Sequence, residues 1–274
     1  MPIRQTPGFV RCLLAASLLI STLYAAPAAA KRASPFEIDL RVELPLLTAA
    51  VAIWLTPQFI ATDLGAPACD PCDPAQLNGL DRAVINFSST AAKSASDVLV
   101  GVIPALAAGA TLLNYGRYGG KSITEDLLIL AEVLAISGAM HQVVRFAVRR
   151  PRPFMYVAGK YAEDRDAIGS TLSFYSGHTS IAFAMATAGA YLYTIRNPRS
   201  RYAALVWTGA LLGAGAVGYS RVAAGRHFWT DAIAGAVVGT AVGLLVPALH
   251  LKKKRKVKLT LGPSGAGLGL MAVY

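Results

Sequence analysis

Apolar residues in this chain gather in long runs that short polar segments separate. After residue 30, six runs each approach the length needed to cross a bilayer. A hydrocarbon core of about 30 Å takes on the order of 20 helical residues, and only helices and closed barrels satisfy their backbone groups in lipid. The pattern therefore predicts an all-α, polytopic membrane helix bundle of about six transmembrane helices. The runs are roughly 44–60, 96–115, 126–144, 179–195, 203–219 and 232–249.

Two further segments alternate apolar and polar residues with the period of a strand. They are FEIDLRVEL at 36–44 and KVKLTLGPSGAGLGLMAVY at 256–274, where Gly-Pro-Ser-Gly separates two alternating runs. An even number of spans brings both termini to one side of the membrane. The termini can therefore add a small β element to the bundle. A disordered polar tail is the alternative.

The N-terminal segment has the pattern of a secretory signal. Arg4 and Arg11 give it a basic start, an apolar core follows, and Ala28-Ala29-Ala30 precedes Lys31 as a cleavage site. An uncleaved first membrane helix is the alternative. We therefore divide the chain into a signal peptide or N-terminal membrane anchor at 1–30, one transmembrane domain at 31–250, and a basic segment with a C-terminal tail at 251–274.

The composition supports a membrane protein. Of the 274 residues, 54% are hydrophobic and only 15% are charged, against about 25% charged residues in soluble domains. The formal net charge of +11 is concentrated near the ends of apolar runs, in 145–152 and in 252–256. This distribution favours membrane topology and phosphate binding over nucleic acid as the reason for the basic residues.

The basic loops also indicate an orientation. GRYGGK, RNPRSR and KKKRK share one side, which the positive-inside rule assigns to the cytoplasm, so that 145–178 and 220–231 face outward. A cleaved signal followed by six spans would invert this topology. The sequence leaves open whether 9–30 remains uncleaved or 44–60 does not span. In an outward loop, Cys69 and Cys72 of the CDPC segment favour a disulfide over a zinc site or two free thiols.

Three polar clusters fall on the predicted outer side. The first holds Arg145, Arg149, Arg150 and Arg152, the second is Tyr175-Ser176-Gly177-His178, and the third is SRVAAGRHFWTD at 220–231. Arginine matches phosphate oxygens, and Ser176 is a good N-cap for a helix whose first N–H groups attract anions. His227 and Asp231 are four residues apart and share one helix face. Seven side chains are interpreted as caps or membrane anchors: Asp81, Arg82, Arg149, Arg150, Arg226, Phe228 and Trp229.

The clusters together favour phosphoryl transfer. One histidine can attack phosphorus while the other protonates the leaving oxygen, and the arginines stabilise the charge of the transition state. No group of Asp, Glu and His residues has the sequence spacing of metal ligands, so we expect neither a metal nor another cofactor.

These residues resemble the signature of the type 2 phosphatidic acid phosphatase (PAP2) superfamily, which is K-x6-RP, PSGH and SR-x5-H-x3-D. The chain has Arg145-x6-Arg152-Pro153, then Ser176-Gly177-His178, then Ser220-Arg221-x5-His227-x3-Asp231. The motifs cover 145–231, and the helical architecture covers about 44–249. Arg145 stands in place of the usual lysine and Tyr175 in place of the usual proline, which puts the phosphate contact of Arg145 and the substrate preference in doubt.

The resemblance implies a role for each matching residue. His227 is the nucleophile that forms a phosphohistidine, Asp231 orients it, and His178 is the general acid. The phosphate ligands implied are Arg145, Arg152, Ser176, Gly177 and Arg221.

The expected protein is a metal-independent lipid phosphatase of the membrane branch, in the inner membrane of a bacterium, with its active site facing the periplasm. Its partners are a lipid phosphate substrate and membrane lipids, and the oligomeric state stays open. Candidate substrates are undecaprenyl diphosphate, phosphatidylglycerol phosphate, phosphatidate and the lipid A phosphates. A lipid phosphotransferase with the same site and a non-catalytic headgroup-binding protein are the alternatives.

Overall fold

A computed structural model describes residues 31–60, 69–161, 168–252, 258–264 and 267–273. The first compact unit of the chain is Met1–Arg32, and most of it, including the predicted signal or anchor at 1–30, lies outside the described residues. The second unit is Ala33–Tyr274.

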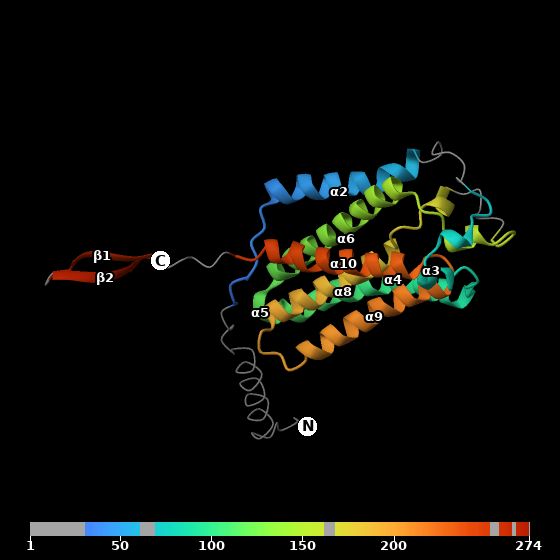
Figure 1. Cartoon of the computed structure of the whole chain (residues 1–274). Helices are drawn as coiled ribbons and strands as arrows, with labels where there is room; N and C mark the ends of the chain where they lie inside the picture. Colours follow the sequence, from blue (N-terminus) through green and yellow to red (C-terminus); the bar gives the residue numbers. More distant parts are fainter. Residues whose placement is uncertain (1–30, 61–68, 162–167, 253–257, 265–266, 274) are drawn as a thin grey trace, which may run out of the picture. The chain divides into compact units, whose positions relative to one another are not determined.

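The described part of this unit is built on six long helices (Figure 1). They are α2 (Leu40–Ile60), α4 (Thr90–Ala110), α6 (Gly120–Val148), α8 (Gly177–Arg196), α9 (Ala203–Ala223) and α10 (Trp229–Leu249). Five of them contain a predicted apolar run in full, and α4 contains most of the run 96–115, so the prediction of an all-α membrane bundle is confirmed. Short helical turns lie between them: η2 (Pro74–Gln76), α3 (Gly79–Arg82), η3 (Thr111–Asn114), α5 (Tyr115–Tyr118), η4 (Pro153–Tyr156) and η5 (Ile168–Thr171).

Four helical segments of the described chain are long and apolar enough to cross a membrane. They are Thr90–Tyr118, Gly120–Tyr156, Ala203–Ala223 and Trp229–Leu249. Helix α8 lies among four neighbours, α4, α6, α9 and α10, and most of its buried side chains are small or polar. Because those helices shield it, α8 does not need a strongly apolar surface.

Glycines allow α10 to pack closely on α8. Gly235, Gly239 and Gly243 recur every four residues on one face of α10. A Cβ atom at Gly239 would collide with the backbone oxygen of Ser180, and the other two glycines meet α8 in the same way. Small residues in such a stripe let two membrane helices approach to backbone contact.

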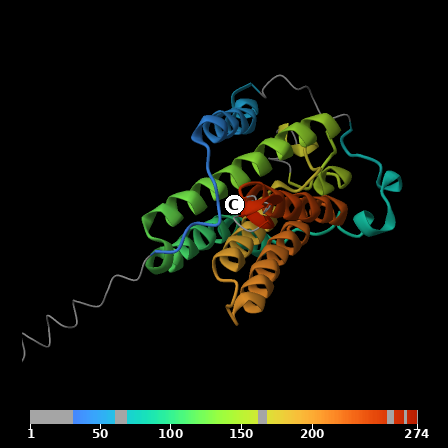
Figure 2. The same ribbon diagram turned by 90° about the vertical axis from the view of Figure 1, so that its left-hand side faces the viewer.

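Helix α2 packs along α6, as both views show (Figure 2). The Trp54 ring covers Gly138, and Gln142 Nε2 donates a hydrogen bond of 2.7 Å to the backbone oxygen of Trp54. The strand predicted at 36–44 is wrong, because α2 already begins at Leu40. Asp39 accepts a hydrogen bond from the Arg41 N–H at this end of α2, which favours a helix start over a continued strand.

The C-terminal alternation does form strands. Strand β1 (Lys258–Ser264) pairs with β2 (Gly267–Val273) in an antiparallel hairpin, as the two alternating runs predict. The two termini share no sheet among the described residues. Their contact is a single antiparallel bridge between Phe36 and Leu251.

The course of the chain gathers the three polar clusters at one end of the bundle. Helices α6 and α9 end there, and α8 and α10 begin there, together with the start of α4. At the opposite end, the buried Arg196 of α8 pairs with Glu125 and Asp126 of α6 at 3.0 and 2.6 Å. This buried ion pair joins α8 to α6 away from the three clusters.

Candidate active site

His227 lies in the connection between α9 and α10 and is 2% exposed. Its Nδ1 lies 2.9 Å from the backbone oxygen of Ser173. A carbonyl oxygen only accepts hydrogen bonds, so Nδ1 carries the ring proton and Nε2 keeps its lone pair. Arg152 Nη1 lies 3.3 Å from that Nε2. The neighbours of His227 therefore select the tautomer in which Nε2 can act as a nucleophile.

The electrostatics of the site favour a neutral His227. Burial lowers the pKa of His227 well below its usual value, and the positive charge of Arg152 lowers the pKa further. Asp231 acts in the opposite direction, but its effect on this pKa is smaller than that of burial. The imidazole is therefore unprotonated near neutral pH, which is the form that a nucleophile requires.

Asp231 contacts the surroundings of His227 more closely than it contacts the ring. Its Oδ2 is 3.8 Å from His227 Nδ1, which is beyond hydrogen-bond distance. The same oxygen accepts hydrogen bonds from Ser173 Oγ at 2.6 Å and from the Phe228 N–H at 2.9 Å. Arg150 Nη1 donates to Oδ1 at 2.7 Å. Asp231 thus fixes both Ser173, which orients the ring, and the start of α10.

Arg150 and Asp81 form a buried pair behind the site. Arg150 Nη2 lies 2.8 Å from Asp81 Oδ2, and Asp81 also accepts hydrogen bonds from the N–H and Oγ1 of Thr230. Burial by itself raises the pKa of Asp81, but the hydrogen bonds from Arg150 and Thr230 outweigh burial and lower it. The interpretation of Arg150 and Asp81 as headgroup anchors is therefore wrong: both brace Asp231 from the protein side.

A cavity of about 280 Å³ opens between the clusters. Four of the lining residues are positively charged and one is negatively charged. Arginine and lysine side chains suit a phosphoryl group. Its lining residues are Lys93, Asp97, Arg152, Phe154, Gly169, Ser170, His178, Arg221 and Arg226.

Asp97 of α4 connects two of the predicted site residues. Its Oδ1 lies 3.1 Å from His178 Nε2 and 3.1 Å from Arg221 Nη1. Arg221 also donates a hydrogen bond to Ser96 Oγ. The sequence analysis did not select Asp97. An ionisable residue near the start of an apolar run is nevertheless a candidate functional residue. Helix α4 therefore contributes a wall that the three motifs do not reveal.

Arg152 joins the cavity to His227. Its Nε donates to the Gly169 oxygen at 2.6 Å and its Nη1 to the Arg226 oxygen at 2.7 Å. The guanidinium of Arg226 lies 4.2 Å from the centre of the Tyr161 ring and faces the same cavity. Arg226 is therefore part of the cavity wall.

The prediction of a membrane anchor at 226–229 is wrong for Phe228 as well as for Arg226. Phe228 is fully buried, and the guanidinium of Arg150 lies 4.2 Å from the centre of its ring. Trp229 is partly buried and packs against the apolar cluster that contains Phe228, Val84 and Val222.

Three predicted phosphate ligands are not among the residues that line the cavity. Ser176 is fully buried, and its Oγ accepts hydrogen bonds from the backbone N–H and the hydroxyl of Thr179 as the N-cap of α8. Gly177 packs against the His141 ring, where a Cβ would lie 2.7 Å from Cε1. Arg145 lies on the last turns of α6 and is half-buried. These residues shape the end of α8 and α6 next to the cavity.

A disulfide stabilises the loop above this end of the bundle. Cys69 and Cys72 are joined, as the CDPC spacing favours. The Cys72 N–H donates to the Met155 oxygen at 2.9 Å, and Cys72 packs against Phe154, which lines the cavity. The disulfide loop thereby supports one wall of the site.

The chain also matches a known protein family by sequence. The sequence model of the PAP2 superfamily matches residues 126–255, which include all three motifs, so the resemblance found in the motifs is confirmed. No curated protein matches the chain. Among solved structures, the chain is similar to the crystal structure of the first transmembrane PAP2 type phosphatidylglycerolphosphate phosphatase from Bacillus subtilis. The two are 21% identical, the match covers 78% of this chain and 98% of that chain, and the TM-score is 0.46.

Proposed function

We propose that this chain is a membrane lipid phosphatase that hydrolyses a lipid phosphate or diphosphate through a phosphohistidine on His227. The observation that carries the proposal is the tautomer of His227. The Ser173 oxygen favours the proton on Nδ1, so the lone pair of Nε2 points at Arg152, which lines the cationic cavity. A phosphoryl group bound by Arg152 would therefore lie next to Nε2.

The first step transfers the phosphoryl group to the protein. The lone pair of His227 Nε2 attacks phosphorus, the bond from phosphorus to the leaving oxygen breaks, and His178 gives a proton to that oxygen. Asp97 contacts His178 at Nε2, so Nδ1 is the nitrogen that can serve the leaving group. The products of this step are the dephosphorylated lipid and a phosphohistidine.

The second step releases phosphate. His178, now neutral, takes a proton from water, the water oxygen attacks phosphorus, and the bond from phosphorus to His227 Nε2 breaks. Arg152 and Arg221 face the charge that develops on the phosphoryl oxygens in both steps. Arg226 and Lys93 add further positive charge to the cavity wall.

The substrate class follows from the setting of the cavity. The cavity lies at one end of a bundle whose helices can cross a membrane, so a phosphorylated headgroup can enter while its apolar chains stay in lipid. Undecaprenyl diphosphate, phosphatidylglycerol phosphate, phosphatidate and lipid A phosphates all meet this description. The same residues would also serve a phosphotransferase that hands the phosphoryl group to another lipid.

We assign the active-site end to the periplasmic face of a bacterial inner membrane. The basic loops at 116–121 and 196–201, at the opposite end, favour the cytoplasm for that end. The disulfide between Cys69 and Cys72 supports the assignment, because disulfides persist in oxidising compartments and the loop lies at the active-site end.

Phosphate release by the purified protein in detergent tests the proposal. The substrates are the four candidate lipid phosphates, and the variants are His227→Ala and His178→Ala. We expect wild type to release phosphate from at least one of these lipids, and both variants to lose it.

Each alternative gives a different result in the same assay. Transfer of labelled phosphate to an added lipid alcohol, without free phosphate, indicates a phosphotransferase. Binding of the lipids without any phosphoryl transfer indicates a headgroup-binding protein and contradicts the proposal.

A further inference from the structure

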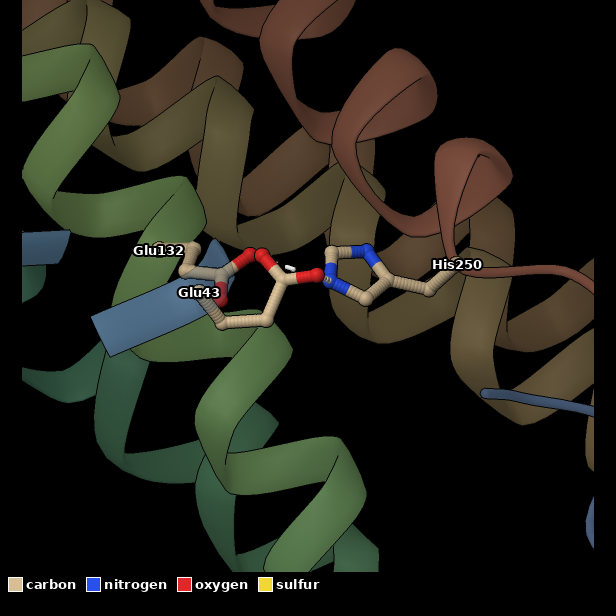
Figure 3. Close-up of side chains that lie close together, drawn as sticks. All are labelled: Glu43, Glu132 and His250. Atoms are coloured by element: carbon tan, nitrogen blue, oxygen red, sulfur yellow. Dashed lines mark ion pairs between the residues drawn. The ribbon is translucent and has the colours of Figure 1, made fainter. Parts of the chain in front are cut away.

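Three ionisable side chains from distant parts of the chain meet at the end of the bundle opposite the active site. They are Glu43 in the first turn of α2, Glu132 of α6 and His250 at the end of α10 (Figure 3). His250 Nε2 lies 3.1 Å from Glu132 Oε2 and 3.4 Å from Glu43 Oε1. The other ring nitrogen, Nδ1, contacts the Val246 oxygen at 2.8 Å. This contact leaves Nε2 as the nitrogen that faces the two carboxylates.

Glu132 is buried without a hydrogen bond. It is 1% exposed, and neither of its oxygens has a hydrogen-bond partner among the described residues. His250 Nε2 likewise has no partner in hydrogen-bond geometry in the described chain, although it lies in ion-pair contact with both carboxylates. A buried carboxylate that is not hydrogen-bonded is costly, so its retention calls for a compensating ligand.

The spacing of the three donor atoms fits one metal ion. The ligand atoms lie within 4.8 Å of one another. In a tetrahedral zinc site with bonds of about 2.0–2.1 Å, ligand atoms are separated by about 3.3 Å. The distances of 3.1 and 3.4 Å from His250 Nε2 match this separation. The imidazole of His250 suits Zn²⁺ better than Mg²⁺ or Ca²⁺, which prefer oxygen ligands alone, and Zn²⁺ also accepts carboxylate ligands.

We propose that Glu43, Glu132 and His250 bind a structural Zn²⁺ ion that joins α2 to α6 and α10. The ion would neutralise the two carboxylates and leave one coordination position for water.

The position of the site explains what the ion contributes. Among the long helices, the contacts of α2 are concentrated on α6. The chain enters α2 through a segment that meets the end of α10 by the Phe36–Leu251 bridge and by a hydrogen bond from the Glu37 N–H to the His250 oxygen. A metal at this point holds the peripheral helix to the rest of the bundle.

Zinc binding to the tag-free, full-length protein in detergent tests the proposal. The protein is first treated with a chelator, and zinc chloride is then titrated by calorimetry and by thermal unfolding. We expect stoichiometric zinc uptake and a rise in Tm for wild type. His250→Gln and Glu132→Gln each weaken zinc affinity by about 100-fold or more, because loss of a ligand exceeds the 10- to 100-fold cost of losing an outer contact.

Two further variants keep the result interpretable. Glu37→Gln removes an exposed carboxylate of the same segment and should leave zinc uptake unchanged. The Glu43 side chain is 14% exposed, against 1% for Glu132, so its substitution disturbs the fold less. Glu43→Gln therefore replaces Glu132→Gln in the test if the Glu132 variant fails to fold. Absence of zinc uptake by wild type overturns the proposal. So does uptake that survives in both His250→Gln and Glu43→Gln, because that zinc would bind elsewhere.

Discussion

The backbone oxygen of Ser173 lies 2.9 Å from Nδ1 of His227 and orients the ring of the proposed nucleophile. Orientation of a histidine by a carbonyl has the same effect on the tautomer as orientation by a carboxylate, since both accept only the Nδ1 proton. It adds no full negative charge next to the ring, so it does not raise the pKa of the imidazole as a contacting carboxylate would.

Substitutions at Ser173 and Asp231 test separately the effects on kcat of the Ser173 hydroxyl and of the Asp231 carboxylate. Ser173→Ala removes a hydroxyl but keeps the carbonyl oxygen, so kcat should stay within about tenfold of wild type. Asp231→Ala leaves Arg150 and the Phe228 N–H without their acceptor, and kcat should fall by about 100-fold or more. Hydrogen bonds to a charged group contribute about 1.5–3 kcal/mol each. Steady-state phosphate release gives kcat for both variants. Equal decreases in kcat would contradict the larger role assigned to Asp231.

The buried charge of Arg150 should matter for stability. Its side chain is 20% exposed and pairs with the fully buried Asp81 and Asp231. Arg150→Met leaves two buried carboxylates without their cation, and breaking such a pair costs about 3–5 kcal/mol. The exposed neighbour supplies the matched control: Arg149→Met should change the free energy of unfolding by no more than about 0.5 kcal/mol. Denaturant unfolding in micelles compares the two, and a similar loss in both variants would refute the assignment.

The sequence was sufficient to predict the helices and the gathering of the three polar clusters at one end of the bundle. Each long apolar run became a helix, and the order of helix ends explains why His178, Arg221 and His227 meet at one end of the bundle. The strand predicted at 36–44 was wrong because alternating apolar and polar residues over nine positions do not exclude the start of a helix. Asp39 and the packing of Phe36 decided that segment, and neither effect is visible in the alternation.

The partners of the charged residues could not be predicted in this way. Arg149 and Arg150 are adjacent and chemically identical, yet one is exposed and the other holds Asp81 and Asp231. The difference arises from the left-handed backbone of Arg149, with φ of 50°, at the end of α6, where the chain turns toward the site. Asp97 was missed for a similar reason: its two partners come from α8 and α9, which only the tertiary fold brings to α4.

Asp97 should act as a positioning residue for the general acid. Asp97→Asn keeps the size of the side chain but removes the charge that faces His178 and Arg221. We expect kcat to fall by about tenfold or more on an alkyl phosphate, whose leaving oxygen needs a proton, and to fall much less on an aryl phosphate, whose leaving group departs without one. The two substrates are compared under the same conditions.

A purely structural role for Asp97 predicts a different outcome. Loss of local packing or of Arg221 position would lower the rates on alkyl and aryl phosphates by the same factor. Lys93→Gln is the control, because Lys93 lines the cavity and contacts Asp97 Oδ2 at 3.3 Å, whereas His178 contacts Oδ1. The ratio of the two rates in Lys93→Gln should remain that of wild type.

The pH dependence of kcat/KM should report the protonation of His227. Burial and the charge of Arg152 lower the pKa of His227, so the ring stays neutral as the pH falls through 6.5. The acidic limb of the wild-type profile, which reports His227, should therefore lie clearly below pH 6.5. Burial and the charge of Arg221 also lower the pKa of the general acid His178, to about 4, so the basic limb of the profile reports His178. In Arg152→Gln one cause of the low pKa is removed, so the acidic limb should move to higher pH, in addition to the overall loss from weaker phosphate binding. The position of the limb distinguishes the two effects, because weaker phosphate binding alone lowers the whole profile without moving it. An acidic limb that stays in place in Arg152→Gln would show that Arg152 does not control the charge of the nucleophile.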